Sequence, residues 1–340
     1  MRKKYLLLLS LSLLAIFAAT IKIQPIKAHA SATSEIVMEL STETVLAENN
    51  ADQRLPMAST TKIMTALIIV EDCNLDEVIT VPDAAVGVEG SSIYLKKDEQ
   101  IDVRDLVYGL MLRSGNDSAA ALAIHHSGSI ENFIKVMNER AAQLGAKNTN
   151  FKNPSGLPDD EHYTTARDLC VIACKAMKND TFKQIVSSKS YSGKFRSYEN
   201  KNKMLRNYEG ANGVKTGYTV KAGRCLVSSA ERNGMDVVTV VLNCYDMYER
   251  SSQLLDKCFS DYKVLNIDQN SIFISGEVLC KLAKNEKIIV KNAETLSFKV
   301  ISDMNDKKIK AGDYAGRLEI YNQNNLIFCA DLYSIMSTEN

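Results

Sequence analysis

The sequence has little proline and glycine and no excess of charge of either sign. Its 340 residues include only 5 prolines and 16 glycines, which excludes collagen-like and low-complexity chains. Lys and Arg together number 41, and so do Asp and Glu, so no global positive charge marks a nucleic-acid partner. Hydrophobic residues make up 45% of the chain. The sequence therefore predicts an ordinary globular protein, with room for two domains and without a nucleic-acid partner.

Positive charge is concentrated at the beginning of the chain. Basic residues at 2–4 precede an uncharged run rich in leucine and alanine over 5–21, and small residues at 28–30 flank a cleavage point. This layout is typical of a secretory signal peptide, so we predict a signal peptide over 1–30 and export to the extracytoplasmic face of the cell membrane or the cell wall. A retained transmembrane anchor is the alternative, and it is the only route to membrane association that we expect. Without this segment, 36 basic residues stand against 41 acidic ones, so the remaining chain is mildly acidic.

The eight cysteines raise the question of disulfides, because the chain is expected to be exported. Their number is low for this length, and several lie in apolar segments, such as Cys225 in 224–227, where cysteine packs as a small hydrophobic residue. Cys170 and Cys174 are one helical turn apart, but a lone pair at this spacing indicates core packing more often than a metal site. We therefore expect neither a compact disulfide framework nor a bound metal.

The first half of the chain after the signal begins with strands and continues with helices. Two short strands, at 35–40 and 44–48, surround a polar turn and predict a hairpin suited to a sheet edge. A helix begins near Ser59, and its body at 63–70 is apolar nearly all round, which predicts burial inside a domain. Further helices are expected over 103–112, 117–126 and 130–144.

Strands return in the second half. The apolar segments 225–230 and 237–242 flank Asn233-Gly234, the dipeptide that best fits a tight type I′ hairpin turn. A closing helix is expected over 248–259. We therefore predict an α+β domain over 31–266, in which helices pack on an antiparallel sheet.

A domain boundary is expected near Ile267. Beyond it, short strand-like runs alternate with turns rich in Asn, Asp, Lys and Gly, which predicts a small all-β domain over 267–340. We find no internal repeat and no long linker.

Ser59 and Lys62 put a hydroxyl and an amine three residues apart at the start of the buried helix, where positions i and i+3 share a face. A serine becomes a good nucleophile when a neighbouring base takes its proton, and a lysine serves as that base when burial or nearby positive charge lowers its pKa. The helix N-terminus also offers backbone N–H groups to a developing oxyanion. An N-cap role is the alternative for Ser59. The same spacing at Ser260 and Lys263 is interpreted as a chance match.

Ser114-Gly115-Asn116 lies between two expected helices. Residues of these types commonly end one helix and begin the next, and that is the alternative interpretation. In a catalytic interpretation, the second hydroxyl relays a proton to a leaving amine, and the asparagine amide holds Lys62 and a substrate carbonyl. Other motifs must accompany this one before catalysis is favoured.

Lys215-Thr216-Gly217 is expected to open a strand just before the hairpin. Glycine there lets a substrate backbone approach the strand edge, lysine attracts a carboxylate, and the threonine hydroxyl hydrogen-bonds to it. A solvated lysine beside a bulge glycine is the alternative.

The three motifs occur in the order Ser-x-x-Lys, Ser-x-Asn and Lys-Thr-Gly, each in the structural context that its role requires. In this combination the sequence resembles the penicillin-recognising serine enzymes, and most closely the low-molecular-mass serine D-alanyl-D-alanine carboxypeptidases. The similarity covers residues 34–259. Blocks that resemble the motifs of this family stand at 56–65, 89–95, 114–117, 153–157, 164–168 and 213–219.

The resemblance implies a fold like that of β-lactamases and DD-peptidases, and it assigns a role to each motif residue. The roles are nucleophile for Ser59, base for Lys62, second catalytic element for Ser114 and Asn116, and substrate carboxylate site for Lys215, Thr216 and Gly217. Arg250 stands at the spacing after Lys-Thr-Gly where family members carry an arginine, so it is expected to bind the terminal carboxylate of the substrate.

Two features depart from the pattern of the family. Tyr218 follows Lys-Thr-Gly where some members have histidine, and tyrosine keeps a hydrogen-bonding tip but differs in size and titration. We keep Tyr218 among the substrate-binding residues and expect it to change rate and substrate preference, not the reaction class. The C-terminal amphipathic membrane helix of the family has no counterpart in 331–340, which is too short and lacks a basic polar face.

The resemblance implies that the protein removes the terminal D-alanine from peptidoglycan stem pentapeptides through an acyl-enzyme on Ser59, without a cofactor and with β-lactam antibiotics as covalent inhibitors. A class A β-lactamase is one rival, but it needs a glutamate that activates the deacylating water. Glu161 is the only glutamate in 151–168, and its setting does not resemble that motif. A penicillin-sensing wall protein is the other rival, and it would be acylated without turnover.

The histidines are not expected to act in catalysis. His125 and His126 end an alanine-rich helix, and His162 lies in a loop. No spacing from a serine or a carboxylate points to a Ser/His/Asp triad, so capping or surface roles are expected for all three.

Overall fold

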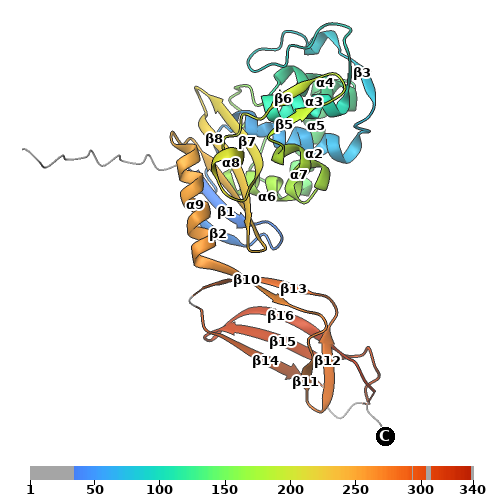
Figure 1. Cartoon of the computed structure of the whole chain (residues 1–340), viewed down its shortest axis with the longest axis vertical. Helices are drawn as coiled ribbons and strands as arrows, with labels where there is room; N and C mark the ends of the chain where they lie inside the picture. Colours follow the sequence, from blue (N-terminus) through green and yellow to red (C-terminus); the bar gives the residue numbers. More distant parts are fainter. Residues whose placement is uncertain (1–33, 293, 304–307, 338–340) are drawn as a thin grey trace, which may run out of the picture. The chain divides into compact units, whose positions relative to one another are not determined.

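The computed structural model describes residues 34–292, 294–303 and 308–337. The predicted signal peptide over 1–30 lies outside the described residues. In the described part of the chain, no helix is long and apolar enough to cross a membrane. The predicted α+β architecture is confirmed: helices pack on an antiparallel sheet, and an all-β region follows (Figure 1).

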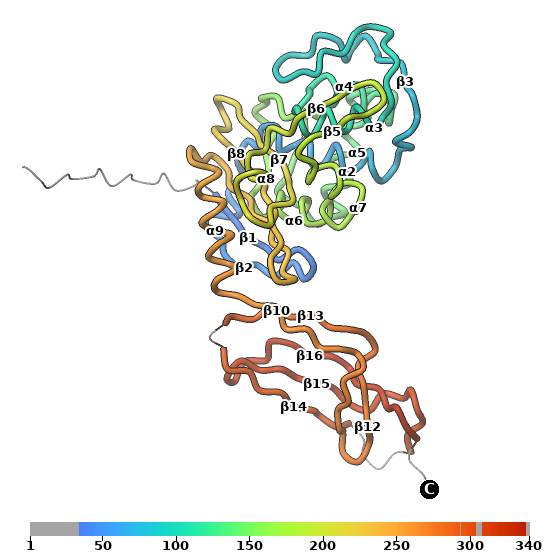
Figure 2. The backbone as a smooth tube through the Cα atoms, viewed as in Figure 1, coloured from blue at the N-terminus to red at the C-terminus, as the bar shows by residue number. Residues whose placement is uncertain are grey.

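A five-stranded antiparallel sheet forms the centre of the first region, with the strand order β2-β1-β9-β8-β7. The strands are β1 (Ser34–Glu39), β2 (Val45–Asn49), β7 (Ala211–Thr219), β8 (Gly223–Arg232) and β9 (Met235–Leu242). The predicted N-terminal hairpin is confirmed, and β2 lies at the sheet edge. Because β1 pairs with β9, the start of the described chain lies beside strands formed about two hundred residues later, as the colours of Figure 2 show.

The predicted type I′ turn between β8 and β9 is confirmed. Asn233 and Gly234 have φ angles of 52° and 76°, and a type I′ turn requires positive φ at both central residues. This turn fixes the register, with Arg232 opposite Met235.

The sheet is covered on both faces, and every residue of its central strand β9 is buried. Val238 and Val240 belong to the core formed with the main group of helices, whereas Val237 and Val241 pack with helix α9 (Met247–Asp261). Successive strand residues point to opposite faces, so burial along the whole strand is explained by this three-layer arrangement (Figure 1).

Helices cover the face of the sheet opposite α9. They are α2 (Lys62–Asp72), α3 (Val103–Tyr108), α4 (Asn116–Ser127), α5 (Ile130–Gln143), α6 (Ala166–Met177) and α7 (Asp180–Ser187). Residues 62–69 of α2 are buried, as predicted from the apolar sequence of the helix. The helix expected over 103–112 is shorter than predicted, because it changes into a π-helical turn, η3 (Gly109–Arg113).

The remaining elements of the first region are short. They are the 3₁₀ turns η1 (Ala58–Thr61) and η2 (Asp83–Ala85), helix α8 (Met204–Asn207), and the hairpins β3 (Val78–Thr80) with β4 (Gln100–Asp102) and β5 (Ser190–Ser192) with β6 (Ser197–Glu199). Of these, η1 carries Ser59 and joins directly to α2.

The C-terminal region is all β in its described residues. Strand β10 (Tyr262–Ile267) pairs with β13 (Glu286–Lys291), and a five-stranded sheet contains β11 (Phe273–Ser275), β12 (Val278–Leu282), β14 (Leu296–Ser302), β15 (Tyr314–Asn322) and β16 (Asn325–Ser334). The predicted small all-β module is therefore present. Its pairing begins at residue 262, a few residues before the boundary that we expected near Ile267.

Burial of α2 predicts a measurable contribution to stability. Leu67 is fully buried in the main core, so Leu67→Ala should lower the free energy of unfolding by about 2–5 kcal/mol through lost apolar burial and a residual cavity. Val220 is 92% exposed, and Val220→Ala should change the same quantity by no more than about 0.5 kcal/mol. Denaturant titration of both variants checks this, and equal effects would contradict the packing described for α2.

Candidate active site

Ser59 and Lys62 lie where the 3₁₀ turn η1 runs into helix α2. The Nζ atom of Lys62 donates to the Oγ atom of Ser59 at 3.0 Å. Lys62 is 0% exposed, whereas Ser59 is half-buried and reachable from solvent. Burial, with the charge of Lys215 as the next cause, lowers the pKa of Lys62 well below its ordinary value. Lys62 can therefore be a neutral amine at working pH, in contact with the hydroxyl that it would deprotonate.

Two further oxygens hold the amine of Lys62. Its Nζ atom donates to Oδ1 of Asn116 at 2.7 Å and to the backbone carbonyl of Ser155 at 2.5 Å. The Nδ2 atom of Asn116 donates in turn to the carbonyl of Glu89 at 2.6 Å. The structure therefore brings Ser59, Lys62 and Asn116 together as the sequence predicted.

Ser114 occupies a left-handed conformation at the end of the π-helical turn η3. Its φ and ψ angles are 66° and 32°, a region that costs a non-glycine residue about 1–3 kcal/mol. Ser114 is nearly buried, and helix α4 begins two residues later, at Asn116. The predicted interhelical turn is confirmed. The left-handed conformation of Ser114 lets the chain turn tightly from η3 into α4, which places Ser114 and Asn116 at the start of α4.

Lys215, Thr216 and Gly217 lie in the middle of the edge strand β7, not at its start as expected. Lys215 and Gly217 share one face of the strand. A Cβ atom on Gly217 would lie 3.1 Å from both the carbonyl oxygen of Met57 and the backbone nitrogen of Ser59. Glycine therefore lets β7 approach the nucleophile turn closely.

Lys215 is buried on β7, close to the point where this strand meets the turn that carries Ser59, whereas Tyr218 is exposed. Burial, with the charge of Lys201 as the second cause, lowers the pKa of Lys215 to about 7. Its Nζ atom donates to the carbonyl of Thr216 at 3.0 Å. Tyr218 is 64% exposed, so this departure from the family pattern faces solvent beside the site.

Arg250 lies on α9 and already has a carboxylate partner within the chain. Its Nε and Nη2 atoms donate to the two carboxylate oxygens of Glu35 at 2.8 and 2.5 Å. Glu35 is buried at the start of β1. Binding of a substrate carboxylate by Arg250 stays a prediction, and it would have to compete with this bidentate pair.

The 153–157 loop is a part of the site to which the sequence analysis gave no role. The Oδ1 atom of Asn153 accepts from the backbone N–H groups of Ser155, Gly156 and Leu157 at 3.2, 2.7 and 3.0 Å. This closed turn directs the Ser155 carbonyl at Lys62 and places Gly156 in close contact with the backbone of Ala58. The Asn-Pro-Ser-Gly sequence signals a turn, but no local signal shows what the turn contacts.

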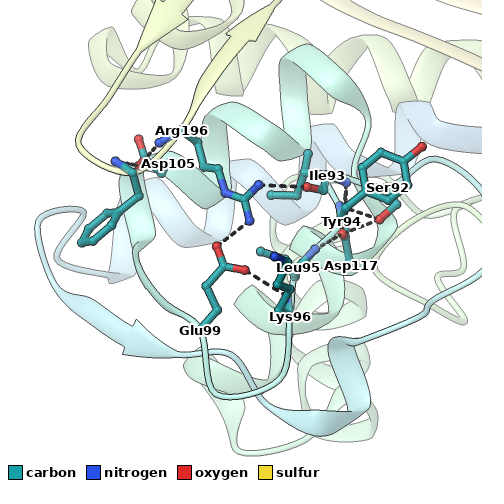
Figure 3. Close-up of polar contacts among 10 residues, drawn as sticks. Ser92, Ile93, Tyr94, Leu95, Lys96, Glu99, Asp105, Asp117 and Arg196 are labelled. Atoms are coloured by element: carbon teal, nitrogen blue, oxygen red, sulfur yellow. Dashed lines mark hydrogen bonds and ion pairs between the residues drawn. The ribbon is translucent and has the colours of Figure 1, made fainter.

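Asp117 ties the second motif to the 89–95 segment, as Figure 3 shows. Its carboxylate accepts from the backbone N–H groups of Ile93 and Leu95 and from the hydroxyl of Ser92. The neighbouring Asn116 binds the same segment through its side chain. The segment is therefore anchored to the start of α4.

A second set of contacts holds the far side of this segment. The guanidinium of Arg196 contacts the carboxylate of Glu99 and donates to the carbonyl of Ile93 at 3.4 Å. The backbone N–H of Arg196 donates to the buried carboxylate of Asp105 at 3.0 Å (Figure 3). The 89–95 segment is therefore held from two sides, by the start of α4 and by Arg196.

His162 is buried, so the surface or capping role expected for it is wrong. It is 3% exposed, and its Nε2 atom lies 2.8 Å from the hydroxyl of Thr61, the residue before Lys62. His125 and His126 lie near the carboxylates of Glu77 and Asp72, at 3.6 and 3.1 Å.

The cysteines form no disulfide in the described part of the chain, where all eight are free thiols. Cys170 and Cys174 are fully buried, in agreement with core packing. Among the described residues, no group of three or more His, Cys, Asp or Glu side chains is arranged to hold a metal ion.

The comparison with protein families identifies the group to which this geometry belongs. The model of the family described as D-alanyl-D-alanine carboxypeptidase, Peptidase S11, matches residues 19–246. The chain belongs to this family. The predicted resemblance and the predicted class of enzyme, a serine D-alanyl-D-alanine carboxypeptidase, are therefore confirmed.

Individual relatives of this D-alanyl-D-alanine carboxypeptidase support the assignment. The D-alanyl-D-alanine carboxypeptidase DacF of Bacillus subtilis is 34% identical over 305 residues, which are 83% of this chain and 77% of that protein. Penicillin binding protein 5 of Haemophilus influenzae superposes with a TM-score of 0.77 at 26% identity, over 92% of this chain and 98% of that one. A mutant of the Streptomyces K15 DD-transpeptidase superposes with a TM-score of 0.64 at 35% identity, over 68% of this chain and 98% of that one.

Lys201 should shift the pH range of the carboxypeptidase. Burial is the main cause that lowers the pKa of both Lys62 and Lys215, and the exposed ammonium of Lys201 lowers both further, so Lys201→Met should raise both. The acid limb of acylation by penicillin, where Lys62 must lose a proton, and the alkaline limb, where Lys215 loses its charge, should both move to higher pH. Rates of acylation between pH 5 and 10 check this, with Lys203→Met as the control on the same segment. Limbs that stay in place or move to lower pH would contradict the electrostatic coupling.

Gly156 should be needed for catalysis because a side chain there would push against Ala58, in addition to the cost of its positive φ. Gly156 and Gly234 both have positive φ, so an alanine at either position should destabilise the fold by about 1–2 kcal/mol. A Cβ on Gly156 would lie 1.9 Å from the carbonyl oxygen of Ala58, whereas a Cβ on Gly234 meets nothing within 4 Å. Gly156→Ala should therefore also slow acylation by about tenfold or more.

The matched control for this experiment is Gly234→Ala. It should lose in thermal unfolding only the stability that its positive φ accounts for, whereas Gly156→Ala should lose more through the clash with Ala58, and it should keep the wild-type rate of acylation. If both variants slow acylation equally, the contact between the 153–157 loop and η1 has no part in positioning Ser59.

Proposed function

We propose that this carboxypeptidase removes the terminal D-alanine from peptidoglycan stem pentapeptides, with Ser59 as the nucleophile and Lys62 as its base. The observation that carries the proposal is the fully buried amine of Lys62, 3.0 Å from the hydroxyl of Ser59. No charged side chain is hydrogen-bonded to this amine in the described structure, where its partners are a hydroxyl, an amide oxygen and a backbone carbonyl. Burial without a paired charge favours the neutral amine, whose two hydrogens go to Asn116 and Ser155 while its lone pair accepts the hydrogen of Ser59.

The proposed acylation step uses the second motif to return the proton. Lys62 takes the proton of Ser59, and the serine oxygen attacks the carbonyl carbon of the penultimate D-alanine. The tetrahedral oxyanion is stabilised by the N–H of Ser59, which lies in a first helical turn without an intrahelical acceptor, and by a backbone N–H near Tyr218. The C–N bond then breaks as the leaving D-alanine amine accepts a proton relayed through Ser114. Water hydrolyses the acyl-enzyme, which restores Ser59.

The proposed carboxylate site lies on β7. Lys215 supplies positive charge from a buried position, and the half-buried Thr216 supplies a hydroxyl. Gly217 lets the substrate backbone and β7 meet close to Ser59, and Tyr218 contacts the substrate from the solvent side. Arg250 would join this site only by leaving Glu35.

Penicillin is proposed to acylate Ser59 because its lactam carbonyl can occupy the same position as the scissile carbonyl. A class A β-lactamase activity is not supported, because the carboxylate of Glu161 is exposed and pairs with Lys152 at 3.3 Å. A penicillin-sensing protein without turnover remains the rival that experiment must separate.

Transpeptidation is a second candidate activity of the same acyl-enzyme. A structure 35% identical to this chain, at a TM-score of 0.64, is described as a DD-transpeptidase. The acyl-enzyme on Ser59 would then be attacked by an amine of a second stem peptide in place of water.

We also propose that residues 1–30 direct export and that the enzyme acts on the extracytoplasmic side of the membrane. Membrane association would then depend on this segment remaining uncleaved. The proposed organisation keeps a catalytic domain after residue 30 and a C-terminal β domain. The pairing of β10 with β13 supports a boundary close to residue 262.

Release of D-alanine from a pentapeptide muropeptide tests the proposed function. Ser59→Ala should lower kcat by at least about 10³-fold, because the attacking oxygen is lost. Ser260→Ala is the matched control, since Ser260 and Lys263 repeat the Ser-x-x-Lys spacing, and it should keep the wild-type rate. Mass spectrometry follows free D-alanine and the acyl-enzyme.

The outcomes separate the candidates. D-alanine release that survives Ser59→Ala would overturn the assignment of the nucleophile. An acyl-enzyme that forms without any release would favour the sensor. A product that gains an added amine would show transpeptidation.

A further inference from the structure

A directed chain of hydrogen bonds runs from His162 to the peptide bond before the nucleophile. The Nδ1 atom of His162 accepts from the backbone N–H of Lys152 at 2.9 Å. A backbone amide can only donate here, so the neutral imidazole carries its hydrogen on Nε2. Nε2 therefore donates to the hydroxyl oxygen of Thr61, 2.8 Å away.

The hydroxyl of Thr61 passes this direction on. Its Oγ1 atom donates its hydrogen to the carbonyl oxygen of Ala58 at 2.8 Å. Because a hydroxyl has one hydrogen, it must accept the bond from His162. His162, Thr61 and Ala58 are all buried, and burial lowers the pKa of His162 to about 4, so the ring stays neutral in the neutral pH range.

The carbonyl of Ala58 and the N–H of Ser59 belong to one planar peptide group. Fixing the carbonyl therefore fixes the direction of the N–H, which points the opposite way in a trans peptide. Ala58 needs this support, because it holds a φ of 48° although it is not glycine. A hydrogen bond at the carbonyl also polarises the peptide and strengthens its N–H as a donor.

We propose that His162 is a positioning residue for the reaction: through Thr61 and the Ala58 carbonyl, it aims the Ser59 N–H at the oxyanion. The inference rests on the proposed function, in which the Ser59 N–H is an oxyanion donor. His162 touches no reacting atom and exchanges no proton with the substrate. Its contribution is made in the transition state, where the oxyanion exists, and not in the initial complex.

Two substitutions divide the ring of His162 into its two hydrogen-bonding functions. His162→Gln places an amide donor near the position of Nε2 and loses the acceptor at Nδ1. His162→Asn keeps an oxygen acceptor near Nδ1 and loses the donor to Thr61. Only the donor belongs to the chain that reaches Ser59, whereas the acceptor merely anchors the 152 backbone.

The measurement is the rate of penicillin acylation, resolved by stopped flow into the dissociation constant of the initial complex and the first-order acylation step. His162→Asn should slow the acylation step by about tenfold to a hundredfold, as expected for a misplaced catalytic group. The dissociation constant should stay within about twofold of wild type, because the oxyanion is absent from the initial complex. His162→Gln should acylate within about threefold of wild type, since it restores the donor.

Thr61 supplies a second test that does not depend on how His162 variants fold. Thr61→Ser keeps the hydroxyl and should keep the acylation rate, whereas Thr61→Val should slow the acylation step as His162→Asn does. In the double variant of His162→Asn and Thr61→Val, the losses should not add, because both break the same chain.

Equal losses for His162→Gln and His162→Asn, or a wild-type acylation rate in Thr61→Val, would overturn the inference. Slower acylation that follows a lower unfolding temperature in every variant would assign His162 to stability alone. Ser59→Ala separates this result from a failure of the proposed function: acylation that persists in Ser59→Ala rejects the nucleophile itself, whereas His162 variants with unchanged rates reject only the positioning role.

Discussion

The burial of one amine is the constraint on which the rest of the site depends. A lysine ammonium inside a protein is unfavourable unless a charge balances it, and Lys62 has neutral oxygens as its hydrogen-bond acceptors. Asp117 opposes the effect of burial and raises the pKa of Lys62. Its carboxylate is directed at the 89–95 segment, however, where three hydrogen-bond donors meet it. The amine is thereby left poised as a base.

Positive φ angles mark each segment that reaches this amine. They are found at Ala58, Ser114 and Gly156, which come from η1, from the end of η3 and from the 153–157 loop. At Ala58 and Ser114, which are not glycine, such conformations persist only where surrounding contacts over-determine them. Here the surroundings are the buried helix α2, the start of α4 and the Asn153 turn, each of which holds one side of Lys62. The packing that stabilises the domain therefore also holds the site residues in the geometry that the reaction needs.

Local chemistry made much of this structure predictable, and long-range chemistry did not. The Asn233-Gly234 turn, the apolar body of α2 and the three motifs could be recognised because each signal lies within a few residues. The Ser155 carbonyl and His162 could not, because a carbonyl has no sequence signature and an isolated histidine has many roles. The π-helical turn before Ser114 also left no local signal, since its residues 109–113 are ordinary for an α-helix. The sequence alone does not show which distant parts of the chain contact the motif side chains.

The position of Tyr218 shows how this architecture separates chemistry from substrate choice. Tyr218 is exposed, whereas Lys215, three residues earlier and on the opposite face, which Gly217 shares, is buried. Alternation along a strand explains the difference, because successive residues face opposite sides. Tyr218 is not among the groups that shift the pKa of Lys62 or Lys215, so we expect a change from histidine to tyrosine at this position to act on what an incoming substrate contacts from solvent. Residues at the rim of the site can thus differ in what they offer a substrate, whereas the interior is constrained by the need for a buried base.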